Sequence, residues 1–357
     1  MIAALWLLML PSAVPDFATL SAQADAARKA NNPAAVELYR RALRLNPSWK
    51  EGWWSLGSIY YQQDNYSDCG DAFEKAAGLE PKAGAPWTMV GLCEFGAKRF
   101  DRAFEHLKKG QELGVPVESI DSVAKFQFAK LLVKRGNFEQ ALGLLITIAQ
   151  TGKTGAAYLN VAGLAALWKP VFVEEIAPAD RELVFLAGKA LWDIGMKHAA
   201  DARQSFDVLL SKYPSSPGVN YFHGTYELAD DPDRAITDFE QELKISPQHV
   251  GALMALAAEY LRRGEVDKGL PYARRSVELY PDSFASHAML GRLLAASGDS
   301  DEALRELETA RRLGPEQPET RIALASLYAK LGREEDAARE RREFLRLKNS
   351  GREGSQQ

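Results

Sequence analysis

The stretch "WWSLGSIYYQQDNYSDCGDAFEKAAGLEP", residues 53–81, decides the fold. Its first half carries large and small residues at the spacing i, i+3, i+4, i+7, which is one face of a helix: Trp53, Leu56, Gly57 and Tyr60. Its second half repeats this at i, i+4, i+7 with Cys69, Phe73 and Ala76. Pro81 then marks a helix end, because proline cannot continue the hydrogen-bond ladder. The stretch therefore predicts two antiparallel helices that cross closely at a glycine and a small residue.

The pattern recurs along the chain with a constant period. Prolines mark the ends of successive units: Pro47, Pro81, Pro214, Pro247, Pro281 and Pro315. Pro47 and Pro81 are 34 residues apart, as are Pro247 and Pro281. A period of this size is typical of a solenoid built from helix pairs. Units of this kind begin near Asp16, Lys50, Gly84, Ser122, Arg181, Ser216, Val250, Phe284 and Pro318.

The unit resembles a tetratricopeptide repeat, with a Trp-Leu-Gly-Tyr first helix and an Ala-Phe-Ala-Pro second helix, and Cys69 stands where the alanine is usual. This resemblance implies an all-α, right-handed superhelical solenoid of about nine antiparallel helix pairs. It covers most of the chain and is specific for the fold, but its consensus residues serve packing and name no function.

The pattern breaks at residues 151–180. A first helix is expected up to Lys169, but Pro170 stops it and no full second helix follows. This segment is either a stacking defect that the solenoid tolerates, a bend between two sub-arrays or a binding element. The predicted organisation is a leader at 1–22, repeats at 23–150, the irregular segment, repeats at 181–348 that end in a polar cap, and a disordered tail at 349–357.

The N-terminal run "MIAALWLLML" is apolar but too short to span a bilayer. Its length suits a secretory signal with cleavage near Ala22, although a basic first region is missing. We expect an exported, periplasmic or secreted protein, or a cytoplasmic one if this run is the first helix of the fold. Cys69 and Cys93 are either two packed thiols or a disulfide, which needs α-carbons within about 7 Å.

No sequence pattern supports catalysis, a cofactor or a metal. Gly152–Lys153–Thr154 lacks the glycine and the preceding strand of a phosphate loop. The five histidines form neither an HExxH motif nor a pair at i, i+4. The formal net charge of −4, with acidic residues interrupting the basic runs, gives no reason to expect a nucleic-acid partner. We therefore expect a non-catalytic scaffold.

The resemblance implies a concave groove lined by fixed positions of each first helix. In this chain the groove would contain Trp54, Ser58, Tyr61, Leu92, Phe95, Phe126, Lys130, Lys134, Phe185, Lys189, Trp192, Tyr221, Met254, Arg262, Arg292 and Lys330. Some of these residues would instead pack on the neighbouring repeat. Members that clamp a C-terminal carboxylate have Lys and Asn in this groove, and Trp54, Ser58, Thr88 and Leu92 depart from that pattern.

Two functions remain open. The first is a protein-interaction scaffold whose groove binds a protein or peptide segment. The alternative is an accessory subunit or saccharide-binding component of a bacterial envelope, secretion or assembly complex. In either case no membrane span is expected in the mature chain, because no later stretch is long and apolar enough.

Overall fold

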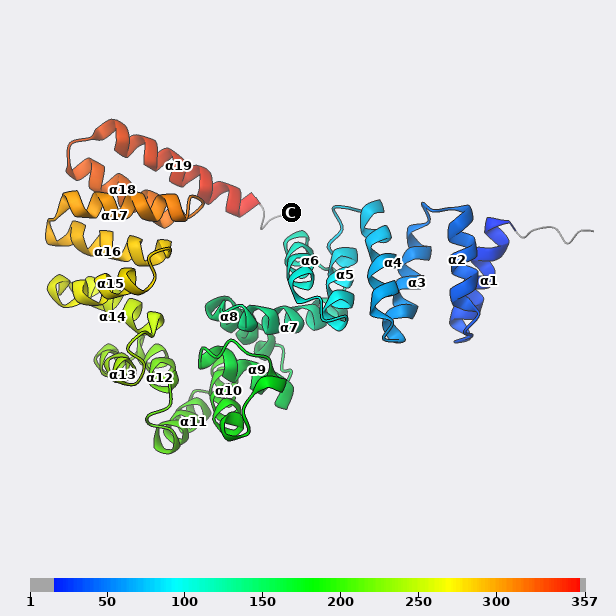
Figure 1. The fold of residues 1–357 in the computed structure, drawn as a ribbon, viewed down its shortest axis with the longest axis horizontal. Coiled ribbons are helices and arrows are strands. Elements are labelled where there is room, and N and C mark those ends of the chain that lie inside the picture. Colours follow the sequence, from blue (N-terminus) through cyan, green and yellow to red (C-terminus); the bar gives the residue numbers. More distant parts are fainter. Residues whose placement is uncertain (1–15, 354–357) are drawn as a thin grey trace, which may run out of the picture. The chain divides into compact units, whose positions relative to one another are not determined.

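The computed structural model describes residues 16–353, and these divide within one helix into two compact units, the first ending at Leu131 and the second beginning at Leu132. Figure 1 shows that consecutive helices of each unit lie side by side. The first unit holds α1 (Phe17–Lys29), α2 (Ala35–Leu45), α3 (Lys50–Gln62), α4 (Tyr66–Leu79), α5 (Gly84–Gly96), α6 (Phe100–Leu113) and most of α7 (Glu118–Lys134).

The second unit continues with helices of similar length. These are α8 (Phe138–Gln150), α9 (Ala156–Ala166), α10 (Arg181–Gly195), α11 (Ala199–Lys212), α12 (Val219–Glu227), α13 (Pro232–Ile245), α14 (Val250–Arg263), α15 (Val266–Leu279), α16 (Phe284–Ser297), α17 (Ser300–Leu313), α18 (Pro318–Lys330) and α19 (Glu334–Glu353). Two short 3-10 helices, η1 (Val173–Glu175) and η2 (Pro178–Asp180), separate α9 from α10.

Within residues 16–353 every regular element is helical, and no strand occurs. The predicted all-α solenoid of helix pairs is therefore confirmed, as is its irregular break. Among these helices, none combines the length and the apolar character that a membrane crossing requires.

The close helix crossing predicted from the glycine of the repeat is present. A methyl group built on Gly57 of α3 would lie 2.8 Å from a ring carbon of Phe73 on α4. That distance is shorter than a van der Waals contact, so the phenyl ring occupies the space that a larger residue at position 57 would need. Gly57 and Phe73 are both buried, and they form the core between the two helices of this repeat.

The large residue near the start of each first helix has a second role besides packing. Trp53 Nε1 donates a hydrogen bond to the carbonyl oxygen of Pro47, six residues earlier, at 2.8 Å. The same bond recurs four times with different donors: Trp87 to Pro81, Asn220 to Pro214, His287 to Pro281 and Arg321 to Pro315. Each bond ties a first helix to the proline that closes the preceding unit. Trp53 itself is half-buried.

The irregular segment is organised by α10, which packs along α9. A methyl group on Gly163 of α9 would lie 1.7 Å from the carbonyl oxygen of Val184, and one on Gly188 of α10 would lie 1.7 Å from that of Leu159. The backbones of the two helices are therefore in direct contact. Because α10 covers α9 and also pairs with α11, the solenoid continues although α9 has no full second helix of its own.

Trp168, just after α9, joins the irregular segment to the flanking repeats. Its indole stacks on Phe138 of α8, with ring centroids 5.2 Å apart, and meets the edge of Tyr221 of α12 at 5.1 Å. It also lies 4.9 Å from the ring of His249, the residue before α14. The segment is thus held by aromatic packing, which favours the stacking-defect interpretation over an exposed binding element.

Two helix ends bear on the predicted boundaries. Helix α1 begins at Phe17, where the Asp16 side chain accepts a hydrogen bond from the backbone N–H of Thr19 at 2.8 Å and so caps the helix. A leader that ended at Ala22 would remove the first part of this helix, including the buried Leu20. Helix α19 runs to Glu353, so the tail predicted as disordered from residue 349 begins inside a helix. The apolar run 1–10 lies outside the described residues.

Cys69 of α4 and Cys93 of α5 are joined by a disulfide, with their α-carbons 5.8 Å apart. Both residues are fully buried. Each occupies a small-residue position of its helix, so the pattern that brings two repeats together also places the two sulfur atoms in contact. The bond connects the second helix of one repeat to the first helix of the next.

Candidate binding surface

The predicted groove residues of α3 are half-buried, with one side of each ring against their own repeat. The edge of Trp54 meets Phe73 with ring centroids 5.2 Å apart, and Tyr61 meets Tyr66 at 6.2 Å. Ser58 Oγ donates to the carbonyl oxygen of Trp54 at 2.8 Å, so this hydroxyl is already used within the helix. These side chains contribute to packing and leave only part of their surface for a ligand.

Three predicted residues of α5 and α7 come together in the first unit. The Lys130 ammonium lies 5.1 Å from the ring centroid of Phe126 and 5.5 Å from that of Phe95. At these distances the negative faces of the two rings attract the cation. One cation and two aromatic rings that the register selected thus lie together on neighbouring first helices.

Lys134, at the end of α7, contacts the irregular segment. Its Nζ donates to Glu175 Oε2 at 2.7 Å and lies 5.2 Å from the ring centroid of Phe172. The pKa of Glu175 is lowered by this lysine and by the hydrogen bond from the backbone N–H of Phe172. Lys134, which was predicted to line the groove, thus contacts η1 and the residue before it.

Three predicted groove residues are buried and do not belong to a free surface: Leu92, Trp192 and Tyr221. The indole of Trp192 donates to the carbonyl oxygen of Lys153 at 2.8 Å, and Tyr221 packs on Trp168, Phe239 and His249. The register that we used ignores contacts with segments outside the repeat, and such contacts help to bury Trp192 and Tyr221.

The other predicted groove residues of the second unit differ in their exposure and in the hydrogen bonds that their side chains make. Phe185 is 38% exposed. Lys189 donates to Asp193 at 2.7 Å and to Ser205 at 3.2 Å. The guanidinium of Arg262 donates to both oxygens of Glu259, so its charge is balanced locally. Met254 is half-buried against the core of the C-terminal repeats.

Arg292 and Lys330 line the same pocket, which crosses the first helices α14, α16 and α18 and has a volume of about 650 Å³. Most of the lining is aliphatic: Leu261, Ala295, Ala296, Leu307, Ile322, Ala323 and Leu327. Glu319 and Ser326 complete it. Ile322 is 42% exposed although it is a large aliphatic residue.

The two cations of this C-terminal pocket have no carboxylate partner among the described residues. Lys330 Nζ donates to the carbonyl oxygen of Ala295 at 3.2 Å, which leaves its positive charge without a carboxylate. Arg292 is exposed and makes no ion pair with any residue that the structure describes. The pocket therefore combines an apolar floor with two cations, and Glu319 is the carboxylate among its lining residues.

Sequence reasoning missed the aliphatic floor of this pocket. Leu261, Ala295 and Ile322 lie on the same first helices as Arg262, Arg292 and Lys330 and also take groove positions of the repeat. The predicted groove did not include them. Reading the register without regard to residue type would have found the floor.

One group of potential metal ligands occurs in the described part of the chain. Ligand atoms of Asp193, His198 and Asp201 lie within 4.8 Å of one another. However, Asp193 Oδ2 already accepts hydrogen bonds from Lys189 at 2.7 Å and from Ser205 at 3.0 Å. The other two side chains are exposed, so the group is explained by these surface contacts.

Known proteins resemble this chain in part. It is 28% identical to cellulose synthase operon protein C of Xanthomonas axonopodis pv. citri over 146 residues, which is 39% of this chain and 10% of that protein. It is 24% identical to anaphase-promoting complex subunit 3 of Schizosaccharomyces pombe over 104 residues, 29% of this chain and 15% of that protein. The matches thus span a small part of these longer relatives.

Among solved structures, MamA 41-end from Desulfovibrio magneticus RS-1 is 20% identical, with a TM-score of 0.42 over 46% of this chain and 94% of that one. The MamA RS-1 ArsTM double mutant is 18% identical, with a TM-score of 0.43 and the same coverage. The tetratricopeptide repeat family matches residues 21–86, 229–284 and 288–350, more than half of the chain, and no catalytic family is indicated. The chain therefore belongs to the tetratricopeptide repeat family.

Proposed function

We propose that this protein is a non-catalytic scaffold that binds an extended segment of a protein partner in the C-terminal pocket. The observation that carries this proposal is the exposed aliphatic surface around Ile322 beside the unpaired guanidinium of Arg292. An exposed apolar patch bordered by polar groups is typical of a binding surface. Proteins of this repeat family commonly bind other proteins, which agrees with this use.

The chemistry of the pocket specifies the segment. Aliphatic side chains of the partner would cover Ile322, Leu261 and Ala295, because burial of apolar surface is favourable. An acidic residue next to them would pair with Arg292, whose planar fork can hold both carboxylate oxygens. We therefore expect a peptide that alternates aliphatic and acidic residues.

Peptide selection from a random displayed library tests the proposal. The unaltered protein should enrich aliphatic and acidic peptides, and titration calorimetry should then give their affinities. Arg292→Glu and Ile322→Asp should each weaken binding by about 1–3 kcal/mol, as expected for residues at the centre of an interface. Arg275→Glu on α15, an arginine paired with Glu278 away from this pocket, is the control and should bind normally.

The opposite outcome is also clear. If selected peptides bind equally to both pocket variants while circular dichroism shows an intact fold, the C-terminal pocket is not the binding surface. The partly exposed rings of α3 and α5 would then be the next surface to examine.

We further propose that the protein is exported. The disulfide between Cys69 and Cys93 supports this, because such bonds persist mainly in oxidising compartments. The apolar run at the N-terminus supports it as well. Because Asp16 caps α1, we now expect cleavage before residue 16. N-terminal sequencing of the natural protein should find a chain that lacks the apolar run 1–10 and starts at or before Asp16, and an intact N-terminus would contradict export by a cleaved leader.

The alternative function is an accessory component of an envelope or secretion complex. The partial similarity to cellulose synthase operon protein C favours it, together with the same support for export. Proximity labelling in the native host distinguishes the two functions. Labelled neighbours that assemble polysaccharide or secretion machinery would favour the alternative.

A further inference from the structure

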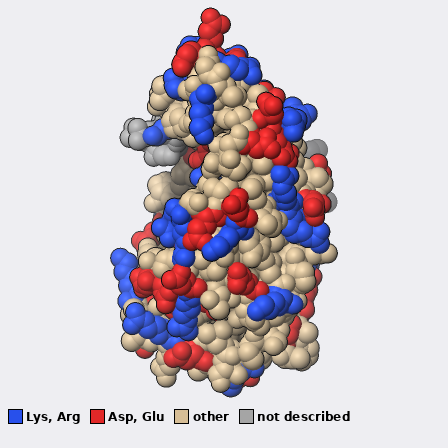
Figure 2. Space-filling model, turned by 90° about the vertical axis from the view of Figure 1, so that its left-hand side faces the viewer, with Lys and Arg blue, Asp and Glu red and all other residues tan. Residues whose placement is uncertain are grey.

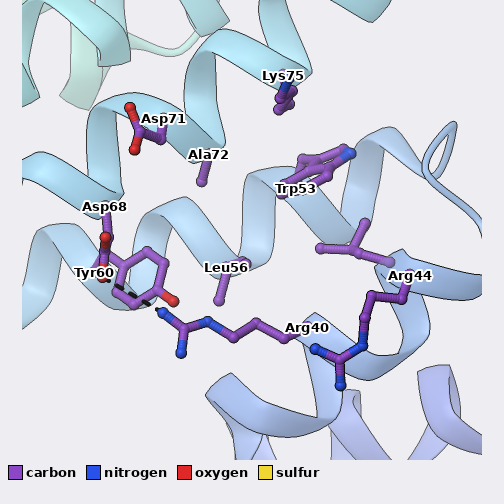
Figure 3. Close-up of a pocket in the computed structure, with 10 residues that line it drawn as sticks. Arg40, Arg44, Trp53, Leu56, Tyr60, Asp68, Asp71, Ala72 and Lys75 are labelled. Atoms are coloured by element: carbon purple, nitrogen blue, oxygen red, sulfur yellow. Dashed lines mark hydrogen bonds and ion pairs between the residues drawn. The ribbon is translucent and has the colours of Figure 1, made fainter.

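A second pocket lies in the first unit, between helices α2, α3 and α4, with a volume of about 320 Å³ (Figure 3). Its lining residues are Arg40, Leu43, Arg44, Trp53, Leu56, Tyr60, Asp68, Asp71, Ala72 and Lys75. None of them belongs to the groove predicted from the sequence. In Figure 3, Arg40 reaches along the pocket from α2 toward the hydroxyl of Tyr60 on α3.

In two other repeats a glutamate accepts a hydrogen bond from the tyrosine at this position. Tyr260 of α14 donates its hydroxyl to Glu240 of α13 at 3.3 Å. Tyr328 of α18 donates to Glu308 of α17 at 2.8 Å. In both cases the tyrosine is buried and the glutamate stands twenty residues before it, on the second helix of the preceding repeat. The buried hydroxyl is thus satisfied by a carboxylate of the protein itself.

Tyr60 occupies the same repeat position, but the residue twenty positions earlier is Arg40. The Tyr60 hydroxyl consequently has no hydrogen-bond partner, although the side chain is only 4% exposed. A guanidinium cannot accept a hydrogen bond, so Arg40 cannot replace the missing glutamate. Its central carbon lies 5.6 Å from the Tyr60 ring centroid, which brings a cation beside an unsatisfied donor.

The cations of the pocket differ in how they are paired. Arg40 approaches Asp68 at 3.5 Å, a long contact, and Arg44 pairs with Glu37 at 3.1 Å. Lys75 makes no ion pair with a described residue. Among the lining residues Lys75 is therefore the cation without a carboxylate partner, and the guanidinium of Arg40 is held only by its long contact with Asp68.

We propose that this pocket binds a carboxylate attached to a short apolar arm. One carboxylate oxygen accepts from Tyr60 Oη and the other from Arg40, so the ligand supplies the group that Glu240 and Glu308 supply in the other repeats. The apolar arm lies against Leu56 and the indole of Trp53. This site is independent of the C-terminal pocket and of the function proposed there.

Two physical properties suit the pocket for this ligand. Burial raises the pKa of the Tyr60 hydroxyl, so it stays protonated and remains a donor at neutral pH. A buried donor without a partner is unfavourable, and a hydrogen bond to a charged acceptor is stronger than one to a neutral group. A ligand carboxylate would give the buried Tyr60 hydroxyl an acceptor, and because the carboxylate is charged the hydrogen bond would be of the stronger kind.

The test uses the full chain labelled with ¹⁵N and two pairs of probes. N-acetyl-glutamic acid α-amide presents a side-chain carboxylate, and N-acetyl-glutamine α-amide is its neutral counterpart. N-acetyl-leucine presents a terminal carboxylate, and its amide is the control. The indole N–H resonance of Trp53, assigned with Trp53→Phe, reports on the pocket because Trp53 lines it.

Each acid should shift this resonance in a saturable way, and its neutral counterpart should not. If N-acetyl-glutamic acid α-amide binds more tightly than N-acetyl-leucine, the natural carboxylate belongs to an acidic side chain. If N-acetyl-leucine binds more tightly, it belongs to the C-terminus of a chain. Tyr60→Phe should weaken binding about tenfold, the size expected for a hydrogen bond to a charged group. Arg40→Glu restores the arrangement of the other repeats, so it should abolish binding and raise the melting temperature.

Tyr260→Phe is the matched control, because that hydroxyl already has its acceptor. It should lower the melting temperature and leave the probe affinity unchanged. The proposal is overturned if the neutral amides shift the Trp53 resonance as strongly as the acids do. It is equally overturned if Tyr60→Phe and Arg40→Glu, both folded, bind the acids as tightly as the unaltered chain.

Discussion

Side chains of quite different chemistry perform one task near the start of the first helices α3, α5, α12, α16 and α18. Tryptophan, asparagine, histidine and arginine each donate to the carbonyl oxygen of a proline six residues earlier. What these residues share is an N–H group at the right reach, because indole, amide, imidazole and guanidinium are all donors. His287 illustrates this: Nε2 bonds to Pro281 and Nδ1 lies 2.6 Å from Glu306. His287 therefore contributes to the packing of neighbouring helices.

His249 should make stability depend on pH. Burial lowers its pKa below the usual value near 6.5, and Glu242 opposes that shift only in part. The unfolded chain therefore takes up the proton first as the pH falls. The contribution of neutral His249 is complete above about pH 6.5 and is lost as the pH drops through the lower folded pKa. Urea unfolding at about pH 7.5 and about pH 5 should show this loss.

The variant His249→Asn isolates this effect. Asparagine keeps an acceptor for the backbone N–H of Ala252, which His249 Nδ1 now caps at 3.2 Å. The other histidines remain in both chains, so they cancel in the comparison. The variant should lose less stability than the unaltered protein between the two pH values, and an identical loss would contradict the assignment.

At the scale of elements, backbone contact between α9 and α10 compensates for the missing second helix. Gly163 and Gly188 face each other across this pair, and each would place a methyl group 1.7 Å from a carbonyl oxygen of the other helix. A helix pair this close buries its backbone groups and its small residues together. The array can therefore pass through the irregular segment without an exposed gap in its core.

Gly163→Ala should separate these helices and destabilise the second unit by at least about 1–3 kcal/mol, the usual range for overpacking. Gly143 on α8 is the matched control, since a methyl group there meets nothing within 4 Å. Gly143→Ala should stabilise the chain by about 0.5–1 kcal/mol, because alanine loses less backbone entropy in a helix. Urea unfolding measures both, and equal effects would show that the close crossing does not restrict position 163.

At the scale of the whole chain, acidic and basic residues are nearly balanced, with a formal net charge of −4. The face shown in Figure 2 mixes acidic and basic side chains without a broad area of one sign. The disulfide is the long-range covalent constraint that the described residues contain, and it lies entirely in the first unit. Stability should therefore respond to reducing agents mainly in that unit.

Reduction of Cys69–Cys93 should destabilise α4 and α5 by about 3 kcal/mol, the chain-entropy value for a loop of this size. Hydrogen exchange read by mass spectrometry should show faster exchange in these helices after reduction, while α14 to α19 keep their protection. A chain with both cysteines replaced by alanine should show no response to the reductant. Uniform loss of protection along the chain would contradict a local effect.

The sequence by itself determined the helix pairs, their period and the irregular break, because these depend on spacings within a few residues. The first helices α3, α5, α10, α14, α16 and α18 begin at the residues expected from the repeat. It also placed Arg292 and Lys330 correctly on one surface. Local spacing could not determine which segments outside a repeat pack on its first helix, so it assigned Trp192 and Tyr221 to the groove although the fold buries both.

Only the tertiary structure decided the disulfide, the aliphatic floor around Ile322 and the unsatisfied hydroxyl of Tyr60. Each depends on the distance between side chains of different repeats, which the period leaves open. Arg40 and Tyr60 are ordinary residues in the sequence. They become a candidate site because the fold sets one beside the other, where two other repeats place a glutamate beside the tyrosine.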